Sequence, residues 1–335
     1  MDAESAVVKA RENIGREWGP HTLLIDDHWI RAVVEATEDP HPLWVDEAFA
    51  RKTPWGGIIA PPWAICSLQG RFRIRLRPVI DLGWGAGSVN AGVQYELYQP
   101  IRPGDAITCR YCIADVFSKT GRSGPLVFVR MEHRLTNQRG ETVLIGKQMS
   151  AYYEGAGLSE SRPITEPTRA ARKANAAEGL WLEEAAPGLR RDPGLGPLFE
   201  DVAIGQELPP VSRGPIQVRN QVKWLSSTED WEEMHYDYVY CRQIGLPDVI
   251  SNGNFGYCST GGRMLTQWLG SEGVLTAFST NYRAPTYIND TLTASGVVTA
   301  KSQDNKTVDI DVTVQNQRGE KAVIGTATAR LRSRS

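Results

Sequence analysis

The chain has 335 residues, a formal net charge of −2 at pH 7 and a hydrophobic content of 41%. This length is typical of two domains, and the nearly balanced charge argues against a nucleic-acid or membrane-surface partner. Since no apolar run reaches about 18 residues and the N-terminus has no apolar core typical of a secretory signal, we expect a cytoplasmic protein without a transmembrane helix.

The first predicted half, residues 1–155, has one helix followed by strands. Pro61 and Pro62 suit the first turn of a helix, where a missing N–H costs little, so a helix is expected over residues 61–72. The glycine-rich residues 83–92 follow no clear strand and are predicted to be a flexible crossing rather than a phosphate loop. Strands are expected, from the pattern of hydrophobic residues, over residues 91–100, 105–116, 125–137 and 142–153.

Residues 156–197 are rich in Gly, Pro and Ala, and this composition predicts a linker with one short helix near residues 168–178.

The second half, residues 198–335, again has one helix, expected over 253–269, before its strands. In the last hairpin, Val308, Ile310, Val312 and Val314 alternate with polar residues, which is typical of a half-buried strand. The strands of this half are expected over residues 275–285, 291–301, 308–314 and 322–332.

The two halves are related by an internal repeat. Residues 36–59 align with residues 227–250 without a gap, and "NQRGETVLIG" has a counterpart in "NQRGEKAVIG". Between these blocks, "PIRPGDAIT" aligns with "PTYINDTLT". A period of about 185 residues indicates a duplicated domain. One helix followed by an antiparallel sheet, twice over, predicts an α+β fold. Two such halves can pair their sheets edge to edge, but the pattern alone does not require it.

The repeat contains one stretch with a chemical difference between its copies. "TEDPHPLWVD" and "TEDWEEMHYD" share their ends, but Trp44 stands where the second copy has His235. Asp230 and His235 can converge only if the chain turns between them. The pair could then hold a water molecule for general acid–base chemistry. The alternative is an exposed helix start, with Thr228 or Asp230 as its N-cap.

The second copy resembles the hydratase motif of the MaoC-like enoyl-CoA hydratases and dehydratases, a family with a double hot-dog fold. The matching residues are Asp230, His235, Asp237 and Gly253, and "GGIIAPP" resembles the family's non-catalytic N-terminal half. The resemblance implies that water held by Asp230 and His235 adds to Cβ of a trans-2-enoyl thioester. The product is an (R)-3-hydroxyacyl thioester, and the reverse reaction is dehydration. The Gly253 N–H is expected to bind the thioester carbonyl.

The same resemblance implies no metal and no cofactor beyond coenzyme A or an acyl carrier as part of the substrate, and a homodimer. This sequence departs from the family where Glu232 and Glu233 replace Asn-Pro, and where Asn252 replaces the His before Gly253. The added carboxylates would either adapt the site to an unusual acyl group or weaken its activity. Substrate contacts are expected from Asn252, Glu232, Ser259, Trp44, Trp63, Arg71 and Arg73.

Several alternatives stay open. Arg71, Arg73, Arg75 and Arg77 alternate with apolar residues, which indicates either a charged outer face or a contact for phosphates of coenzyme A or an acidic carrier protein. The tryptophans near residue 44 are either core or a wall of the acyl pocket. A hot-dog thioesterase, a specialised secondary-metabolism dehydratase and a non-catalytic acyl-thioester-binding protein are the competing functions. Five cysteines without a second CxxC pair indicate neither a disulfide framework nor a metal site.

Overall fold

The computed structural model describes residues 2–76, 82–85, 87–121, 124–154 and 193–334. The predicted linker, including its short helix, falls almost entirely outside these residues. None of the described helices combines the length and apolar character needed to cross a bilayer.

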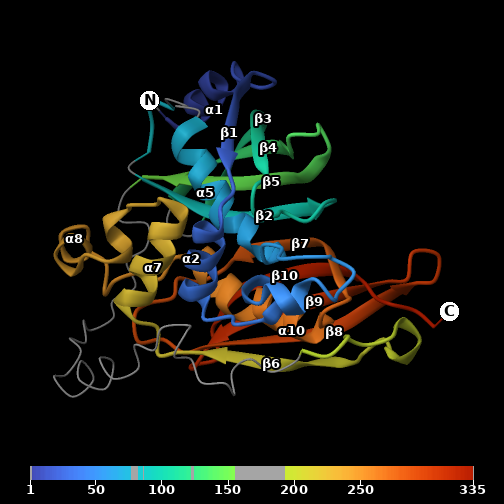
Figure 1. The fold of residues 1–335 in the computed structure, drawn as a ribbon. Coiled ribbons are helices and arrows are strands. Elements are labelled where there is room, and N and C mark those ends of the chain that lie inside the picture. Colours follow the sequence, from blue (N-terminus) through green and yellow to red (C-terminus); the bar gives the residue numbers. More distant parts are fainter. Residues whose placement is uncertain (1, 77–81, 86, 122–123, 155–192, 335) are drawn as a thin grey trace.

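The structure is built on one antiparallel sheet of ten strands, in the order β1-β3-β4-β5-β2-β7-β10-β9-β8-β6 (Figure 1). The first half contributes β1 (Glu17–Leu24), β2 (Gly87–Leu97), β3 (Ala106–Gly121), β4 (Gly124–Thr136) and β5 (Thr142–Tyr153). The second half contributes β6 (Glu207–Arg213), β7 (Val274–Tyr282), β8 (Leu292–Ser302), β9 (Thr307–Asn316) and β10 (Lys321–Arg330). The halves join where β2 pairs with β7, so the sheets do pair edge to edge, as the repeat allowed.

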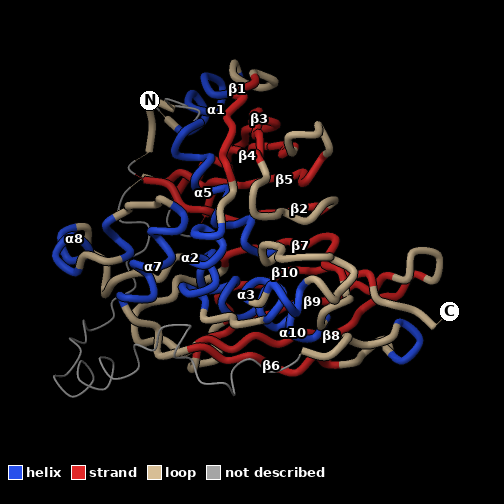
Figure 2. Tube along the Cα trace, viewed as in Figure 1, coloured by secondary structure: helices blue, strands red, loops and turns tan. Residues whose placement is uncertain are grey.

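Helices from both halves pack against this sheet and against one another (Figure 2). The predicted helix of the first half begins with the 3-10 turn η1 (Pro62–Ala64) and continues as α5 (Ile65–Leu76), which is longer than expected. The second helix spans the expected residues as α9 (Gly253–Tyr257), the π-helical turn η4 (Cys258–Gly262) and α10 (Arg263–Leu269). The other α-helices of the described residues are α1 (Ala3–Arg11), α2 (Asp27–Thr37), α3 (Pro42–Val45), α4 (Glu47–Ala50), α7 (Val218–Thr228) and α8 (Tyr238–Gln243).

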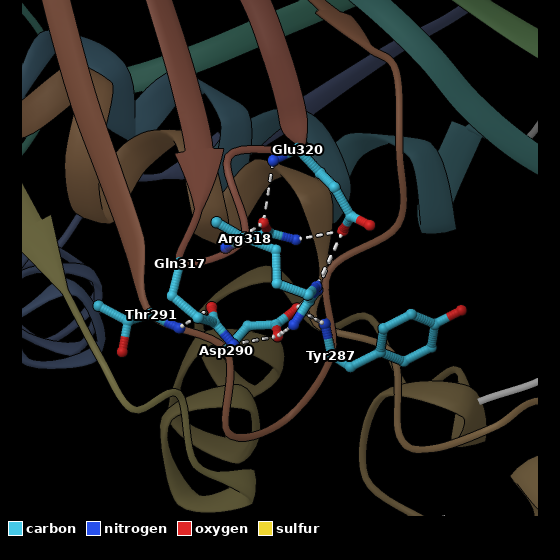
Figure 3. Close-up of polar contacts among 7 residues, drawn as sticks. Tyr287, Asp290, Thr291, Gln317, Arg318 and Glu320 are labelled. Atoms are coloured by element: carbon cyan, nitrogen blue, oxygen red, sulfur yellow. Dashed lines mark hydrogen bonds and ion pairs between the residues drawn. The ribbon is translucent and has the colours of Figure 1, made fainter. Parts of the chain in front are cut away.

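The repeat is preserved in detail where the turn between the last two strands of each half contacts the loop that precedes β8 or β3. Asp290 accepts hydrogen bonds from the Tyr287 N–H and from Gln317 Nε2, each at 3.0 Å (Figure 3). In the first half, Asp105 accepts a hydrogen bond from Gln138 Nε2 at 3.1 Å in the same way. The aligned sequence blocks therefore fold into equivalent local structures.

Strand patterns in the sequence agree with the observed burial. Val308, Ile310 and Val314 of β9 are fully buried, as period-two alternation predicts. The outer strands β1 and β6 were not expected from the sequence, because they lie at the sheet edges and carry few buried residues. The glycine-rich residues 83–92 are not wholly a crossing, since β2 already begins at Gly87.

Candidate active site

The shared Thr-Glu-Asp sequence forms the same helix end in both halves. Helix α2 ends at Thr37 and α7 at Thr228, and each is capped by a glutamate in the left-handed region, Glu38 with φ 51° and Glu229 with φ 55°. The alternative of a helix start is therefore wrong, because this motif ends a helix. The left-handed residue reverses the chain and turns the following aspartate back toward the helix.

Beyond this turn, three polar side chains meet. Asn252 Nδ2 lies 3.4 Å from Asp230 Oδ2 and 3.4 Å from His235 Nε2. His235 belongs to the short 3-10 turn η3 (Glu233–His235), and Asn252 caps α9. The turn between Asp230 and His235 thus brings both side chains to one point, as their spacing required.

The proton position on His235 follows from its neighbours. His235 Nδ1 lies 2.8 Å from the Ile250 carbonyl oxygen, which can only accept a hydrogen bond. Nδ1 therefore carries the proton, and in the neutral ring Nε2 presents a lone pair. The Asn252 amide, which donates through Nδ2, is compatible with this tautomer. The imidazole is thus arranged to accept a proton on the side that faces Asp230.

The orientation of the Asn252 side chain is also fixed. Its Oδ1 accepts hydrogen bonds from Trp224 Nε1 at 3.2 Å and from the Asn254 and Phe255 N–H groups at 3.0 and 3.3 Å. Because these three partners are all donors, the amide nitrogen must face the other way. Gln221 Oε1 accepts the Asn252 N–H at 2.8 Å and holds the residue from a second side.

Gly253 begins α9 and lines the same space as the polar side chains. No hydrogen bond joins its N–H to another described residue, as expected for the first turn of a helix. A Cβ atom at this position would lie 2.8 Å from Cε1 of Tyr282, so only glycine fits beside this ring without displacing it. Tyr282 in turn donates a hydrogen bond to Asn254 Oδ1.

Two arginines of the first half reach this site of the second half. Arg71 Nε lies 2.9 Å from Glu229 Oε1, and Arg73 Nη2 lies 3.8 Å from Asp230 Oδ2. Both belong to α5, so they do not form part of an alternating outer face. The prediction of an arginine stripe fails because the helix continues to Leu76. The side chains of Arg75 and Arg77 lie outside the described part of the chain.

Apart from Arg71, these groups line a cavity of about 1910 Å³. Arg71 was expected to contact substrate, but it pairs with Glu229 and does not line the cavity. Its walls come from both halves, since α5 and β2 of the first half face β7 and the residues around His235. Glu232 lines the cavity as an exposed side chain, and it makes no ion pair with another described residue. Asn252, Arg73 and Glu232 thus reach the cavity as expected. Within the described residues, no group of His, Cys, Asp and Glu is arranged to hold a metal ion.

Three residues expected to contact substrate lie elsewhere. Trp44 is 3% exposed and stacks on His41 with ring centroids 4.4 Å apart. Trp63 is fully buried against Gly262, where a Cβ atom would lie 2.8 Å from the indole. Ser259 is fully buried inside the π-helical turn. None of the three lines the cavity, so these assignments are wrong: the tryptophans belong to the core.

The first-half counterpart of the site is closed. Asp39, which corresponds to Asp230, is 1% exposed, and burial raises the pKa of its carboxyl to about 6. Arg263 Nε of α10 lies 3.9 Å from Asp39 Oδ1. The Trp44 indole donates a hydrogen bond to the Asp39 carbonyl oxygen at 3.1 Å. The tryptophan that replaces the histidine therefore fills the first-half copy and leaves the cavity beside Asp230.

Sequence reasoning missed the residues that orient Asn252 and pack on Gly253. Gln221 and Trp224 of α7 orient Asn252, and Tyr282 of β7 packs on Gly253. No motif marks them, because their roles depend on the way α7 and β7 meet the start of α9. The repeat offers a partial signal, since α7 is the counterpart of α2 and ends at the same Thr-Glu-Asp sequence.

Comparisons with known proteins agree with this architecture. Residues 12–145 match the family model "FAS1-like, dehydratase domain region". A UPF0336 protein from Thermobifida fusca (strain YX) is 28% identical over 142 residues, which cover 42% of this chain and 90% of that protein.

Among known structures, a MaoC-like dehydratase superposes with a TM-score of 0.77 at 18% identity, covering 96% of this chain and 99% of the other. A MaoC-like dehydratase from Phytophthora capsici has a TM-score of 0.61 at 12% identity and covers 99% and 98%. A Mycobacterium tuberculosis protein described as a double hot-dog fold has a TM-score of 0.63 at 13% identity and covers 95% and 96%. The fold is therefore the double hot-dog fold.

Proposed function

Because residues 12–145 match a dehydratase region and the whole chain has the fold of MaoC-like dehydratases, we propose that this protein interconverts trans-2-enoyl and (R)-3-hydroxyacyl thioesters. The observation that carries the proposal is the meeting of Asp230 and His235 at Asn252, inside a large cavity. Such convergence of a carboxylate and a neutral imidazole suits proton transfer to and from one water molecule.

In the hydration direction, a water molecule binds between two acceptors, the Asp230 carboxylate and His235 Nε2. As the water oxygen bonds to Cβ of the enoyl group, one of its protons passes to this pair. The pair returns a proton to Cα, so that water adds across the double bond without net proton uptake. Asn252 Nδ2 holds the two acceptors at a fixed separation and is a positioning residue.

The thioester carbonyl gains negative charge as Cβ is attacked, and it requires a hydrogen-bond donor at that moment. The Gly253 N–H supplies one, since it lies at the start of α9 and lines the cavity. The absence of a side chain lets the carbonyl approach the backbone beside the Tyr282 ring. Asp230, His235 and Gly253 would thus be the catalytic residues.

The proposal is tested with trans-2-enoyl-CoA substrates of varied length, branching and ring content, followed by loss of the conjugated thioester absorbance. The wild-type protein should hydrate at least one of them, and Asp230→Asn should lose about 100-fold or more in kcat while melting at the same temperature. A fully active Asp230→Asn variant would show that the site is assigned wrongly. Release of free coenzyme A thiol without hydration would identify a thioesterase.

Coenzyme A or an acyl carrier protein as the thioester handle, and a homodimer as the assembly, remain predictions. Parallel assays with acyl-CoA and acyl-carrier substrates test the first. Sedimentation velocity tests the second, because the mass of the chain is 37.0 kDa.

A further inference from the structure

One face of α5 lines the cavity from the catalytic site inward. Cys66, Gln69, Gly70 and Arg73 follow the spacing of a single helix face, and all four line the cavity. Arg73 lies beside Asp230, and Gln69 is one turn earlier, about 6 Å along the helix axis. The cavity next to Gln69 is therefore within reach of the acyl part of a thioester bound at Asp230.

A directed chain of hydrogen bonds ends at this place. Tyr95 is fully buried, and burial raises the pKa of its hydroxyl well above the ordinary value, so it keeps its proton. Its Oη lies 2.9 Å from Gln69 Oε1, the one acceptor for that proton among the described residues. Gln69 Nε2 must then donate to Gln148 Oε1. Gln148 Nε2 is left as the open end, and it makes no hydrogen bond to a described residue.

The sheet places a second polar group near this open end. Gln148 of β5 lies opposite Val93 of β2, which lies opposite Thr280 of β7, so the three side chains share one face across the junction of the halves. Thr280 is 1% exposed, and its Oγ1 has no hydrogen-bond partner among the described residues. Both polar residues line the cavity.

The neighbours of this pair in the same cross-strand row are apolar. Met131 lies opposite Gln148 on one side, and Gly325 lies opposite Thr280 on the other. Ile113 and Val312 continue the row on β3 and β9 and are buried. Gln148 and Thr280 are thus two polar side chains in an otherwise apolar row, and each has an unused hydrogen-bonding group that faces the cavity. Burying such a group without a partner is unfavourable, so a ligand that accepts these hydrogen bonds would be favoured.

We propose that Gln148 and Thr280 bind an oxygen atom carried by the acyl tail, so that the substrate is an oxygenated enoyl thioester rather than a plain aliphatic one. This inference rests on the proposed function and names its substrate class. A ketone, ether or hydroxyl oxygen accepts the Gln148 N–H and the Thr280 O–H. An alkyl tail of the same length offers both groups no hydrogen-bond partner, so it binds less well.

The experiment compares matched pairs of CoA thioesters in which one tail methylene, at each position from C5 to C8, is replaced by a ketone. Saturated acyl-CoAs are used for calorimetric binding, and the trans-2-enoyl forms for turnover. For one ketone position, the wild-type protein should bind at least about tenfold more tightly than it binds the alkyl analogue. Gln148→Leu and Thr280→Val should each reduce that preference severalfold, and the double variant should abolish it.

The matched controls are Gln315→Leu on β9 and Thr299→Val on β8, which are exposed and should keep the wild-type preference. A wild-type protein that binds the alkyl compounds as well as every ketone, or a double variant that retains the preference, would overturn the inference. The two proposals fail separately. Absence of turnover with all enoyl compounds would overturn the hydratase reaction, whereas the binding preference is measured on saturated compounds and does not depend on turnover.

Discussion

The Arg73 guanidinium of the first half lies 3.8 Å from the Asp230 carboxylate of the second half, and Arg263 lies 3.9 Å from Asp39 in the reciprocal arrangement. Each half therefore places an arginine of its central helix beside the aspartate of the other. The two pairs differ in their surroundings. Asp230 is 14% exposed and faces the cavity, whereas Asp39 is 1% exposed and closed off. The arginine–aspartate geometry is therefore present in both halves, but only the aspartate of the second half is accessible from the cavity.

We expect Arg73→Gln to lower kcat/KM about fivefold, because it removes a positive charge beside Asp230. Solvent screening limits the pair to about 1 kcal/mol, since Arg73 is 39% exposed. Steady-state kinetics at low and high salt measure the effect, which should shrink as salt rises. Arg110→Gln is the control, because Arg110 pairs with the exposed Glu17 on β1. Equal losses in the two variants would contradict a local role for Arg73.

Asn252→Asp should lower kcat by about 100-fold, because an oxygen replaces the Nδ2 group between Asp230 and His235. The remaining oxygen still accepts the Trp224 N–H, so the fold should persist. Circular dichroism and thermal melting check the fold, and enoyl-CoA kinetics check activity. Asn305→Asp adds the same charge at an exposed position and should be neutral. Wild-type turnover by Asn252→Asp would remove Asn252 from the site.

Gly253→Ala should reduce kcat by about tenfold or more, since the new methyl group would lie 2.8 Å from the Tyr282 ring and displace it or α9. Gly57→Ala is a fair control, because its Cβ atom would meet its nearest neighbour at 3.8 Å. Crystal structures of both variants would show the displacement directly. If Gly253→Ala is as active as Gly57→Ala, close approach to the Gly253 backbone is not required.

Asp39 makes the protein less stable as pH rises from about 4 to about 6. The pKa of its buried carboxyl is about 6 in the native state against an ordinary 3.8, so in this range the native protein holds a proton that the unfolded chain has lost. The free energy of unfolding should fall by about 3 kcal/mol over this window. Asp39→Asn removes this contribution and should gain stability relative to wild type toward pH 7. Urea unfolding at pH 4, 5, 6 and 7 measures the difference, and the exposed Asp304→Asn should show none.

His133 has the opposite effect on acid stability. Burial lowers the pKa of its imidazole to about 3 from an ordinary 6.5, so below pH 6.5 the unfolded chain takes up a proton that the native state refuses. The free energy of unfolding should therefore fall by up to about 5 kcal/mol as pH decreases from 6.5 toward 3. His133→Gln should flatten this decline, and the exposed His28→Gln should not. If the free energy of unfolding falls with the same slope in His133→Gln and His28→Gln as pH decreases, His133 does not control the acid stability.

Local patterns predicted the parts of the fold that depend on local chemistry. Alternation in residues 308–314 and the turn that follows indicated the β9–β10 hairpin, and the repeat predicted that the first half has the same build. The spacing of Asp230 and His235 also indicated that the two can converge only if the chain turns between them. The left-handed Glu229 that begins this turn was not recognisable, because non-glycine residues rarely adopt that conformation.

Contacts between the halves could not be predicted. Arg73 was expected either on a charged outer face or at substrate phosphates, and it lies beside Asp230 because α5 of one half packs on α7 of the other. Trp44 and Trp63 were expected either in the core or at the wall of the acyl pocket, and both are core because the first-half copy of the site is filled. Apolar residues look alike in sequence whether they line a cavity or close one, so packing decides between the two.

The ladder between β2 and β7 makes each half the cover for an otherwise open strand edge of the other. In a fragment that contained only one half, β2 or β7 would have an unpaired strand edge, and the fragment would tend to aggregate. The first half is therefore needed for the fold even though its copy of the site is closed. It must supply a strand whose length and register match β7.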